Sequence, residues 1–209
     1  MVQLTTPSVS TSAFAAHAVT VSQGDKSTLL LDRSTLQASN GSIALSSGAE
    51  SIVDIQGVTT SGNLLASDAI SMSGGQKFVG VMANDLLQAG TDISFIMSGT
   101  ESSLVANTSE VSAGNALSIT GGGKFVGEFN DTTLQAGNGL TIALNGDEGL
   151  FSAVTSTLGS TAGAVSVTSN GTKGVVVLKL GSVVAADNGI TVALAGNESS
   201  LEVNEFTLN

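Results

Sequence analysis

Apolar and polar residues alternate in short runs along most of the chain. Three such runs are LTIAL (140–144), ISFIM (93–97) and ITVAL (190–194). A period of two places every second side chain on one face, which is the pattern of a β-strand with one buried side. Gly and Asn border these runs and are typical of tight turns. The pattern predicts many short strands joined by tight turns.

The strands belong to a repeat of about 24 residues. GGQKFVGVMANDLLQAG (74–90) returns, two repeats later, as GGGKFVGEFNDTTLQAG (121–137). The repeats from residue 77 to residue 196 each begin at a charged residue, alternate, turn at Gly or Asn, alternate again and close on Gly. All repeats are assigned to one domain, 1–209. They start near residues 2, 26, 50, 77, 101, 124, 148 and 173, with a partial repeat at 198–209.

A column of charged residues, called the charge ladder below, marks eight successive repeat starts. Lysine and glutamate alternate in it without a break. The ladder consists of Lys26, Glu50, Lys77, Glu101, Lys124, Glu148, Lys173 and Glu198. If successive repeats stack, alternation replaces repulsion by attraction, and a slip by one repeat sets like charges together. Each exposed pair contributes only about 0–1 kcal/mol, so the ladder is predicted to fix register more than stability.

A repeat of this length with fixed columns predicts an all-β fold, the parallel β-solenoid or β-helix. Each repeat forms one coil, and neighbouring coils pair strand on strand. About eight and a half coils are expected, giving a rod roughly 40 Å tall at the usual strand spacing. An antiparallel sandwich does not explain the fixed columns. A trimeric fibre whose chains share stacked strands remains an alternative.

The predicted solenoid assigns residues to columns. An inner column is expected ten residues after each start, interrupted at Thr60. It contains Leu36, Leu87, Val111, Leu134, Leu158 and Val183. A corner column is expected to adopt positive φ, which Gly adopts freely and Asn tolerates. It contains Asn40, Asn63, Asn115, Asn138 and Asn188 and neighbouring glycines that include Gly41, Gly114 and Gly189. The phenylalanines and glycine of KFVGEF (124–129) are expected to point inward.

Composition excludes some functions. The net charge of −11 argues against a nucleic-acid partner, because phosphate binding needs clustered Lys and Arg. The most apolar stretch, 174–186, is shorter than the roughly 18 residues that a membrane span needs, so no membrane insertion is predicted. SAFAA (12–16) follows no basic region of the kind found in signal peptides. The absence of cysteine excludes disulfides and suits an exported protein.

Candidate chemistry is sparse. The only histidine, His17, cannot form a His-based metal site alone. Asp85 and Asp131 fall at nearly the same place two repeats apart, and a separation of about 10 Å would suit an inverting glycosidase pair. No long loop interrupts the repeats to form a cleft, so neither an enzyme nor a cofactor is predicted. Calcium is the one metal considered, because 145–149 and 185–189 offer oxygen ligands.

Two stretches, LQAGNGLTIALNG (134–146) and SAGNALSIT (112–120), resemble the repeats of filamentous-haemagglutinin-type exoproteins. Those are bacterial surface adhesins of the two-partner secretion type, with β-helical shafts. The likeness covers roughly half of each repeat, and the repeat here is longer than that family's usual one. The resemblance implies a secreted, fibrous, adhesive or scaffolding role, and it carries over no catalytic residue.

The ends of a solenoid expose strand edges. Pro7 in the first repeat is expected to blunt one edge. The segment 201–209 alternates apolar residues and stops within a repeat. The predicted assembly end comprises Leu201, Val203, Phe206 and Leu208.

These features predict a structural subunit or segment of an extracellular or cell-surface fibre, filament or adhesin shaft. Copies of the chain are the expected partners, joined head to tail. One alternative is a carbohydrate-binding or polysaccharide-degrading β-helix module, with glycans or a host surface as partner. The other is a trimeric tail-fibre segment on a virion surface.

Overall fold

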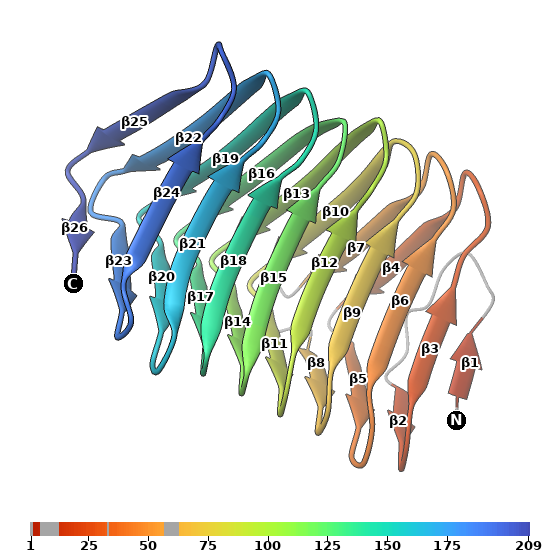
Figure 1. The fold of residues 1–209 in the computed structure, drawn as a ribbon. Coiled ribbons are helices and arrows are strands. Elements are labelled where there is room, and N and C mark those ends of the chain that lie inside the picture. The colour runs from red at the N-terminus through yellow and green to blue at the C-terminus, as the bar shows by residue number, and fades with distance from the viewer. Residues whose placement is uncertain (1, 5–12, 33, 57–62) are drawn as a thin grey trace.

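A computed structural model of the chain describes residues 2–4, 13–32, 34–56 and 63–209. Pro7 and Thr60 lie outside these ranges. The described residues form three parallel sheets of nine, eight and nine strands that run side by side along a rod (Figure 1). This arrangement is a parallel β-solenoid, so the predicted fold class is confirmed.

Each full turn of the solenoid contributes one strand to each sheet. Sheet A contains β1 (Val2–Leu4), β3 (Val19–Ser22), β6 (Ile43–Ser47), β9 (Ile70–Gly74), β12 (Ile93–Met97), β15 (Ala116–Gly121), β18 (Gly139–Leu144), β21 (Ala164–Ser169) and β24 (Ile190–Leu194). Sheet B contains β2 (Ala13–Ala15), β5 (Thr35–Ala38), β8 (Asn63–Ala66), β11 (Leu86–Ala89), β14 (Glu110–Ala113), β17 (Thr133–Ala136), β20 (Thr157–Ser160), β23 (Val183–Ala186) and β26 (Thr207–Leu208). Sheet C contains β4 (Thr28–Asp32), β7 (Ile52–Gln56), β10 (Phe78–Ala83), β13 (Glu101–Asn107), β16 (Lys124–Asn130), β19 (Glu148–Val154), β22 (Lys173–Lys179) and β25 (Ser200–Asn204).

One repeat is one winding of the rod. The chain passes from sheet C to sheet B to sheet A and then enters sheet C of the next winding. Equivalent residues pair directly, as Leu87 does with Val111 and Val111 with Leu134. The columns read from the sequence are therefore columns of neighbouring residues in space.

Side chains that point into the rod form one continuous core. In β16, Phe125, Gly127 and Phe129 are buried, whereas Lys124 and Glu128 are exposed. The inward set predicted for this stretch is confirmed. The alternation explains why the chain folds as stacked strands, because each strand has one apolar face that only the neighbouring windings and sheets can cover.

Large and small core residues alternate between neighbouring windings of sheet C. Leu104 lies between Gly80 and Gly127 in one column, and Phe151 follows Gly127 on the other side. The rings of Phe129 and Phe151 pack with centroids 5.4 Å apart at an interplanar angle of 40°. The two similar segments, 74–90 and 121–137, therefore share a small core residue, Gly80 or Gly127, as well as a ladder lysine.

The inner column of sheet B is continuous, so the predicted interruption at Thr60 is wrong. Leu64 takes the position between Leu36 and Leu87, and it is fully buried. This winding is longer than its neighbours, and the additional residues precede β8. A fixed count from the repeat start therefore reaches the wrong residue.

The same counting error misplaced two further residues. Asn63 begins β8 and pairs with Thr35 instead of turning a corner. Val184 pairs with Leu158 and is 2% exposed, whereas Val183 is only half-buried. Additional residues at a corner shift the register of the strand that follows, which periodicity alone does not reveal.

Positive φ does not mark the Asn/Gly column as predicted. It occurs at the corner between sheets C and B, with φ between 49° and 58°, and at the ladder residues Lys26, Glu50 and Lys77. The residues at that corner are Asn84, Thr108, Asp131, Thr155, Leu180 and Glu205. Within the predicted column, Gly189 has positive φ. Asn138 instead donates its side-chain amide to Asn115 Oδ1 at 2.8 Å, as expected of stacked amides.

A column of buried polar residues directly follows this corner and was not predicted. Its described members are Ser34, Asp85, Ser109, Thr132, Ser156 and Ser182. Ser156 Oγ lies 2.9 Å from the Val154 carbonyl oxygen and 3.0 Å from that of Phe129, and it accepts the Thr132 N–H at 3.1 Å. These side chains satisfy backbone groups that the sheet ladders leave unpaired at the corner.

Replacing Ser156 by alanine is expected to lower the free energy of unfolding by about 2 kcal/mol, because buried backbone groups lose their partner. Urea unfolding followed by far-UV circular dichroism measures this loss. Ser152→Ala, at a half-buried outward position of the same winding, is the control and should change stability by less than about 0.5 kcal/mol. Equal losses in the two variants would contradict a role for the buried hydroxyl.

Candidate functional site: assembly surfaces

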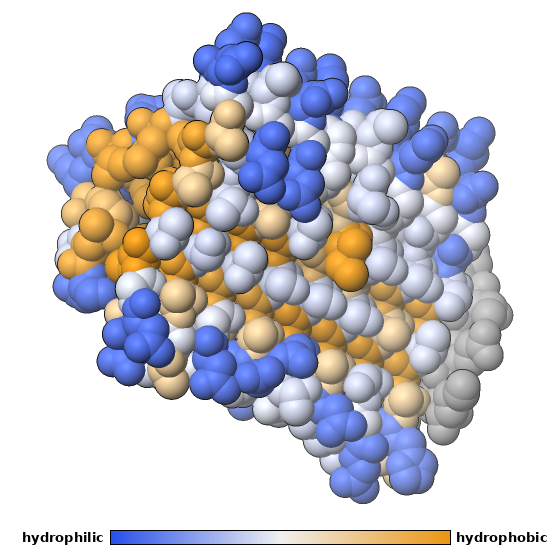
Figure 2. All heavy atoms as spheres, viewed as in Figure 1, coloured by the Kyte–Doolittle hydropathy of each residue, from blue (hydrophilic) through white to orange (hydrophobic). Residues whose placement is uncertain are grey.

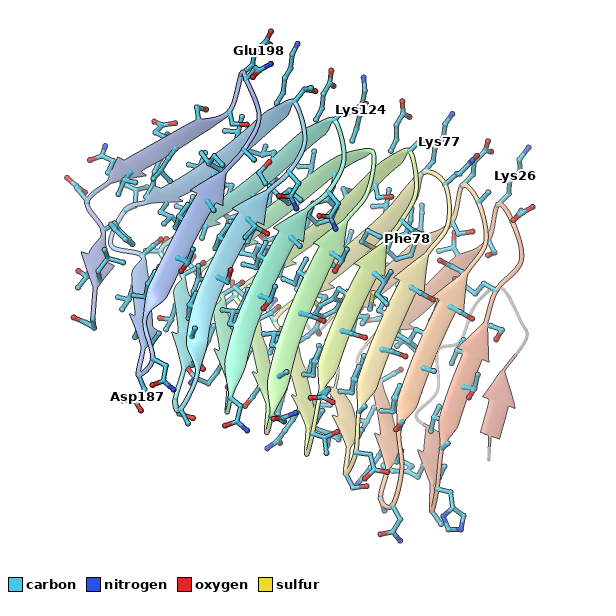
Figure 3. The ribbon with its side chains drawn as sticks, in the orientation of Figure 1. Lys26, Lys77, Phe78, Lys124, Asp187 and Glu198 are labelled. Carbon is cyan, nitrogen blue, oxygen red and sulfur yellow. The ribbon has the colours of Figure 1, made fainter. Side chains whose placement is uncertain are left out.

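The charge ladder runs along one edge of the rod (Figure 3). Glu101 pairs in register with Lys124, Lys124 with Glu148, and Glu148 with Lys173. Three Lys–Glu steps are ion pairs: Lys26–Glu50 at 3.7 Å, Lys124–Glu148 at 3.1 Å and Lys173–Glu198 at 3.2 Å. The stacked alternation read from the sequence is thus present in space. The side chains of these ion pairs are exposed, which is consistent with a role in fixing the register of neighbouring windings.

Lys77 occupies the same column without forming an ion pair among the described residues. The register of its strand places it between Glu50 and Glu101. Lys26, Glu50 and Lys77 have φ between 53° and 55°, whereas the next four ladder residues are the first residues of their strands. The ladder therefore keeps its column although the local backbone changes along the rod.

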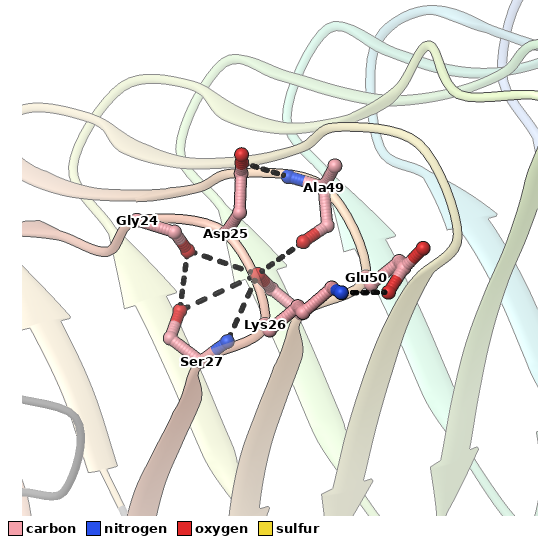
Figure 4. A network of polar contacts seen from close by, with 7 residues as sticks. Gly24, Asp25, Lys26, Ser27, Ala49 and Glu50 are labelled. Atoms are coloured by element: carbon pink, nitrogen blue, oxygen red, sulfur yellow. Dashed lines mark hydrogen bonds and ion pairs between the residues drawn. The ribbon is translucent and has the colours of Figure 1, made fainter.

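Hydrogen bonds tie neighbouring windings together beside the ladder (Figure 4). The Lys26 N–H donates to the Ala49 carbonyl at 2.8 Å, and the Ala49 N–H donates to Asp25 Oδ1 at 2.8 Å. Ser27 Oγ donates to the Gly24 carbonyl at 2.6 Å within the turn. These contacts hold the turn that presents Lys26 to Glu50.

An outward-facing column of sheet C lies two residues after each ladder residue. Five of its eight members are apolar, and these five are called the apolar strip below. The strip contains Ile52, Val79, Val126, Leu150 and Val175. Thr28, Ser103 and Ser200 complete the column. Lys124, Glu148 and Lys173 border a hollow of about 380 Å³ along it.

A second surface, called the terminal layer below, closes the rod after the last full winding. It comprises β24, β25 and β26, which are edge strands of their sheets among the described residues. Leu201, Val203 and Leu208 belong to inward-facing columns, yet they are 47%, 44% and 57% exposed. Phe206 is partly buried against the core. Hydrophobic residues gather at this end of the rod (Figure 2).

The sequence predicted the charge ladder and the terminal layer but not the apolar strip. The signal was present, because Val, Ile or Leu follows most ladder residues by two positions. It was missed because the outward-facing positions were compared between repeats only at the ladder itself. An outward ion pair between Lys179 and Glu202, at 2.6 Å, was also missed.

The expected equivalence of Asp85 and Asp131 is wrong. Asp85 is buried in the polar column, where Oδ2 accepts the Ala83 N–H at 2.8 Å. Asp131 is exposed at the corner itself. One position of register separates a core residue from a surface residue, so the two carboxylates do not form the pair that glycoside hydrolysis requires.

The described residues show no cluster of three or more His, Cys, Asp or Glu side chains that could hold a metal ion. His17 is exposed. Asn145, in one segment considered for calcium, accepts the Asn170 side-chain amide at 3.1 Å. The same residues include no helix long and apolar enough to cross a membrane.

Comparison with protein-family models, curated protein sequences and solved structures finds no match for this chain. The coordinates themselves define the class as a parallel β-solenoid.

Proposed function

We propose that the chain is a structural segment of an extracellular fibre or adhesin shaft and that it joins copies of itself head to tail through the ends of the solenoid. The terminal layer carries this proposal. Inward-facing columns that are at most 2% exposed at Val176, Leu178 and Val184 continue into it as exposed apolar side chains.

The sheet edges support a head-to-tail joint. Among the described residues, β1, β2 and β4 are the edge strands of the three sheets at one end of the rod, and β24, β26 and β25 are the edge strands at the other end. Both ends belong to parallel sheets and present the same three-sheet outline, so one end can continue the hydrogen-bond ladders of the other. A contact between two different ends does not close on itself, and it therefore produces filaments.

Electron microscopy and sedimentation velocity at increasing concentration test this proposal. The chain is expected to form filaments of rod width, whereas the double variant Leu201→Asp/Val203→Asp should remain as short rods, because two buried carboxylates would have no partner in the joint. Ile96→Asp is the control, since Ile96 is 45% exposed on the side of the rod.

Filaments that persist in the double variant, or short rods alone for the unmodified chain at high concentration, would contradict the proposal. Circular dichroism should confirm that the variant keeps its β-sheet signal. A compact trimer would favour the tail-fibre alternative. Binding on a glycan array by the filament-deficient variant would favour the carbohydrate-binding alternative.

A further inference from the structure

The side of the rod carries a surface that is complementary to itself. We infer that the charge ladder and the apolar strip form a lateral interface between two antiparallel copies of this chain, related by a two-fold axis that lies parallel to the sheet C strands. This surface lies on the flank of the rod and is independent of the terminal layer.

The order of charges supports the antiparallel arrangement. The ladder has eight members, begins with Lys26 and ends with Glu198. When one copy is reversed, the first member faces the eighth, the second faces the seventh, and so on. Every Lys then faces a Glu. Two copies aligned in parallel and in register would instead set Lys on Lys and Glu on Glu, which favours the antiparallel pair.

The uncharged column beside the ladder matches under the same reversal. A two-fold axis along the strands keeps each column opposite itself while it reverses the order of the windings. Val79 then faces Leu150 of the second copy, and Ile52 faces its Val175. Polar Thr28 faces Ser200 at the ends of the column. Four of the five apolar members therefore meet apolar partners, Val126 meets Ser103 near the axis, and the polar ends meet each other.

The next outward column of sheet C adds no repulsion. Its acidic members are Asp54, Glu128 and Glu202. In the antiparallel arrangement they face Val177, Val105 and Leu30 of the second copy respectively, so no acid faces an acid.

The intramolecular ion pairs leave the ladder able to bind a second copy. The side chains of Lys26, Lys124 and Lys173 are 77%, 59% and 52% exposed, and an ammonium group has three donors. Ile52 and Val79 are 39% and 37% exposed. From strand spacings the surface measures roughly 34 Å by 13 Å, so it buries an area typical of a weak dimer.

Spin labels determine the orientation. The chain has no cysteine, so Thr108→Cys and Glu205→Cys each create one labelling site at an exposed corner away from the strip. Antiparallel pairing predicts a distance of roughly 11 Å between labels at 108 and roughly 35 Å between labels at 205. Parallel pairing about an axis along the rod predicts equal distances at the two sites. Equal distances at both sites, or the absence of any intermolecular distance at high concentration, would overturn the inference.

The dissociation constant of the lateral dimer tests this surface separately from the terminal layer. All measurements use the Leu201→Asp/Val203→Asp background, in which the ends are blocked. Adding Val126→Asp and Leu150→Asp should raise the dissociation constant of the dimer at least about tenfold, because an apolar contact near the axis is replaced by unpaired charge. Adding Ile96→Asp should leave it unchanged.

The two proposed interfaces can be contradicted independently. Unchanged dimerisation in the Val126→Asp/Leu150→Asp variant would overturn the lateral interface. Persistent filaments in the variant with blocked ends bear on the head-to-tail joint alone. The strip residues are half-buried at most and face outward, so circular dichroism should show an unchanged fold.

Discussion

Replacing Phe151 by alanine is expected to lower the free energy of unfolding by about 4 kcal/mol. The ring is fully buried, and its residue pairs with Gly127 of the neighbouring winding. It also packs against Phe129. No neighbouring side chain can collapse into the cavity without a shift of the stacked backbones, so most of the cavity remains. Urea unfolding followed by far-UV circular dichroism measures the loss, since the chain has no Trp or Tyr.

Phe14→Ala is the matched control, because Phe14 is 66% exposed. It removes the same atoms and should change stability by less than about 0.5 kcal/mol. Similar losses in the two variants would show that the alternation of large and small residues in sheet C does not stabilise the rod. The comparison is made at a concentration below that of assembly, because association adds to apparent stability.

The fold was predictable because residues that lie one repeat apart in a solenoid sequence are neighbours in space. Lys124 and Glu148 are 24 positions apart in the sequence and 3.1 Å apart at their charged atoms. The alternation of charge was therefore sufficient to predict the register of sheet C. The size alternation at Gly127 and Phe151 repeats with the same two-winding period. It was not recognised because its meaning depends on which residues touch across windings.

The parts that could not be predicted depend on local departures from the period. The longer winding before Leu64 moved the inner column by several residues. The single-position difference between Asp85 and Asp131 decides between the core and the surface. The polar column that includes Ser156 was hidden, since Ser and Thr are common throughout the chain and only the corner geometry distinguishes those that are buried.

The assembly surfaces show the same division. Leu201 and Val203 were selected by alternation. The structure places both in columns that face inward in the other windings, and both are exposed in the terminal layer. Alternation places Val126 opposite the inward phenylalanines, but only its register with Val79 and Leu150 shows that the apolar residues form one strip. Burial by neighbouring sheets, which the sequence does not give, decides whether an apolar column is core or contact surface.

Eight glycines stand two residues before the eight ladder members. Replacing one of them is expected to cause the second large loss of stability. They are Gly24, Gly48, Gly75, Gly99, Gly122, Gly146, Gly171 and Gly196. None of the eight has positive φ, so backbone conformation does not require them. A Cβ atom at position 171 would overlap the Gly146 carbonyl group of the winding below. A Cβ at each of the other positions except Gly24 would likewise lie 3.0 Å or less from atoms of the preceding winding. Close approach of the stacked backbones is therefore the reason for glycine at this corner from Gly48 onward.

Gly171→Ala is expected to lower the free energy of unfolding by about 3 kcal/mol, because the overlapping atoms belong to backbone that the sheet ladders hold in place. Gly139→Ala is the control. A Cβ there meets only the Ala164 carbonyl oxygen at 3.7 Å, an ordinary contact, and the reduced freedom of the unfolded chain should make that variant equal in stability or more stable by up to about 1 kcal/mol. Urea unfolding of both variants under the same conditions measures the difference. If Gly171→Ala unfolds at the same urea concentration as Gly139→Ala, the windings are not packed closely enough at the ladder corner to require glycine, and the spacing that sets each Lys beside its Glu is not imposed by that corner.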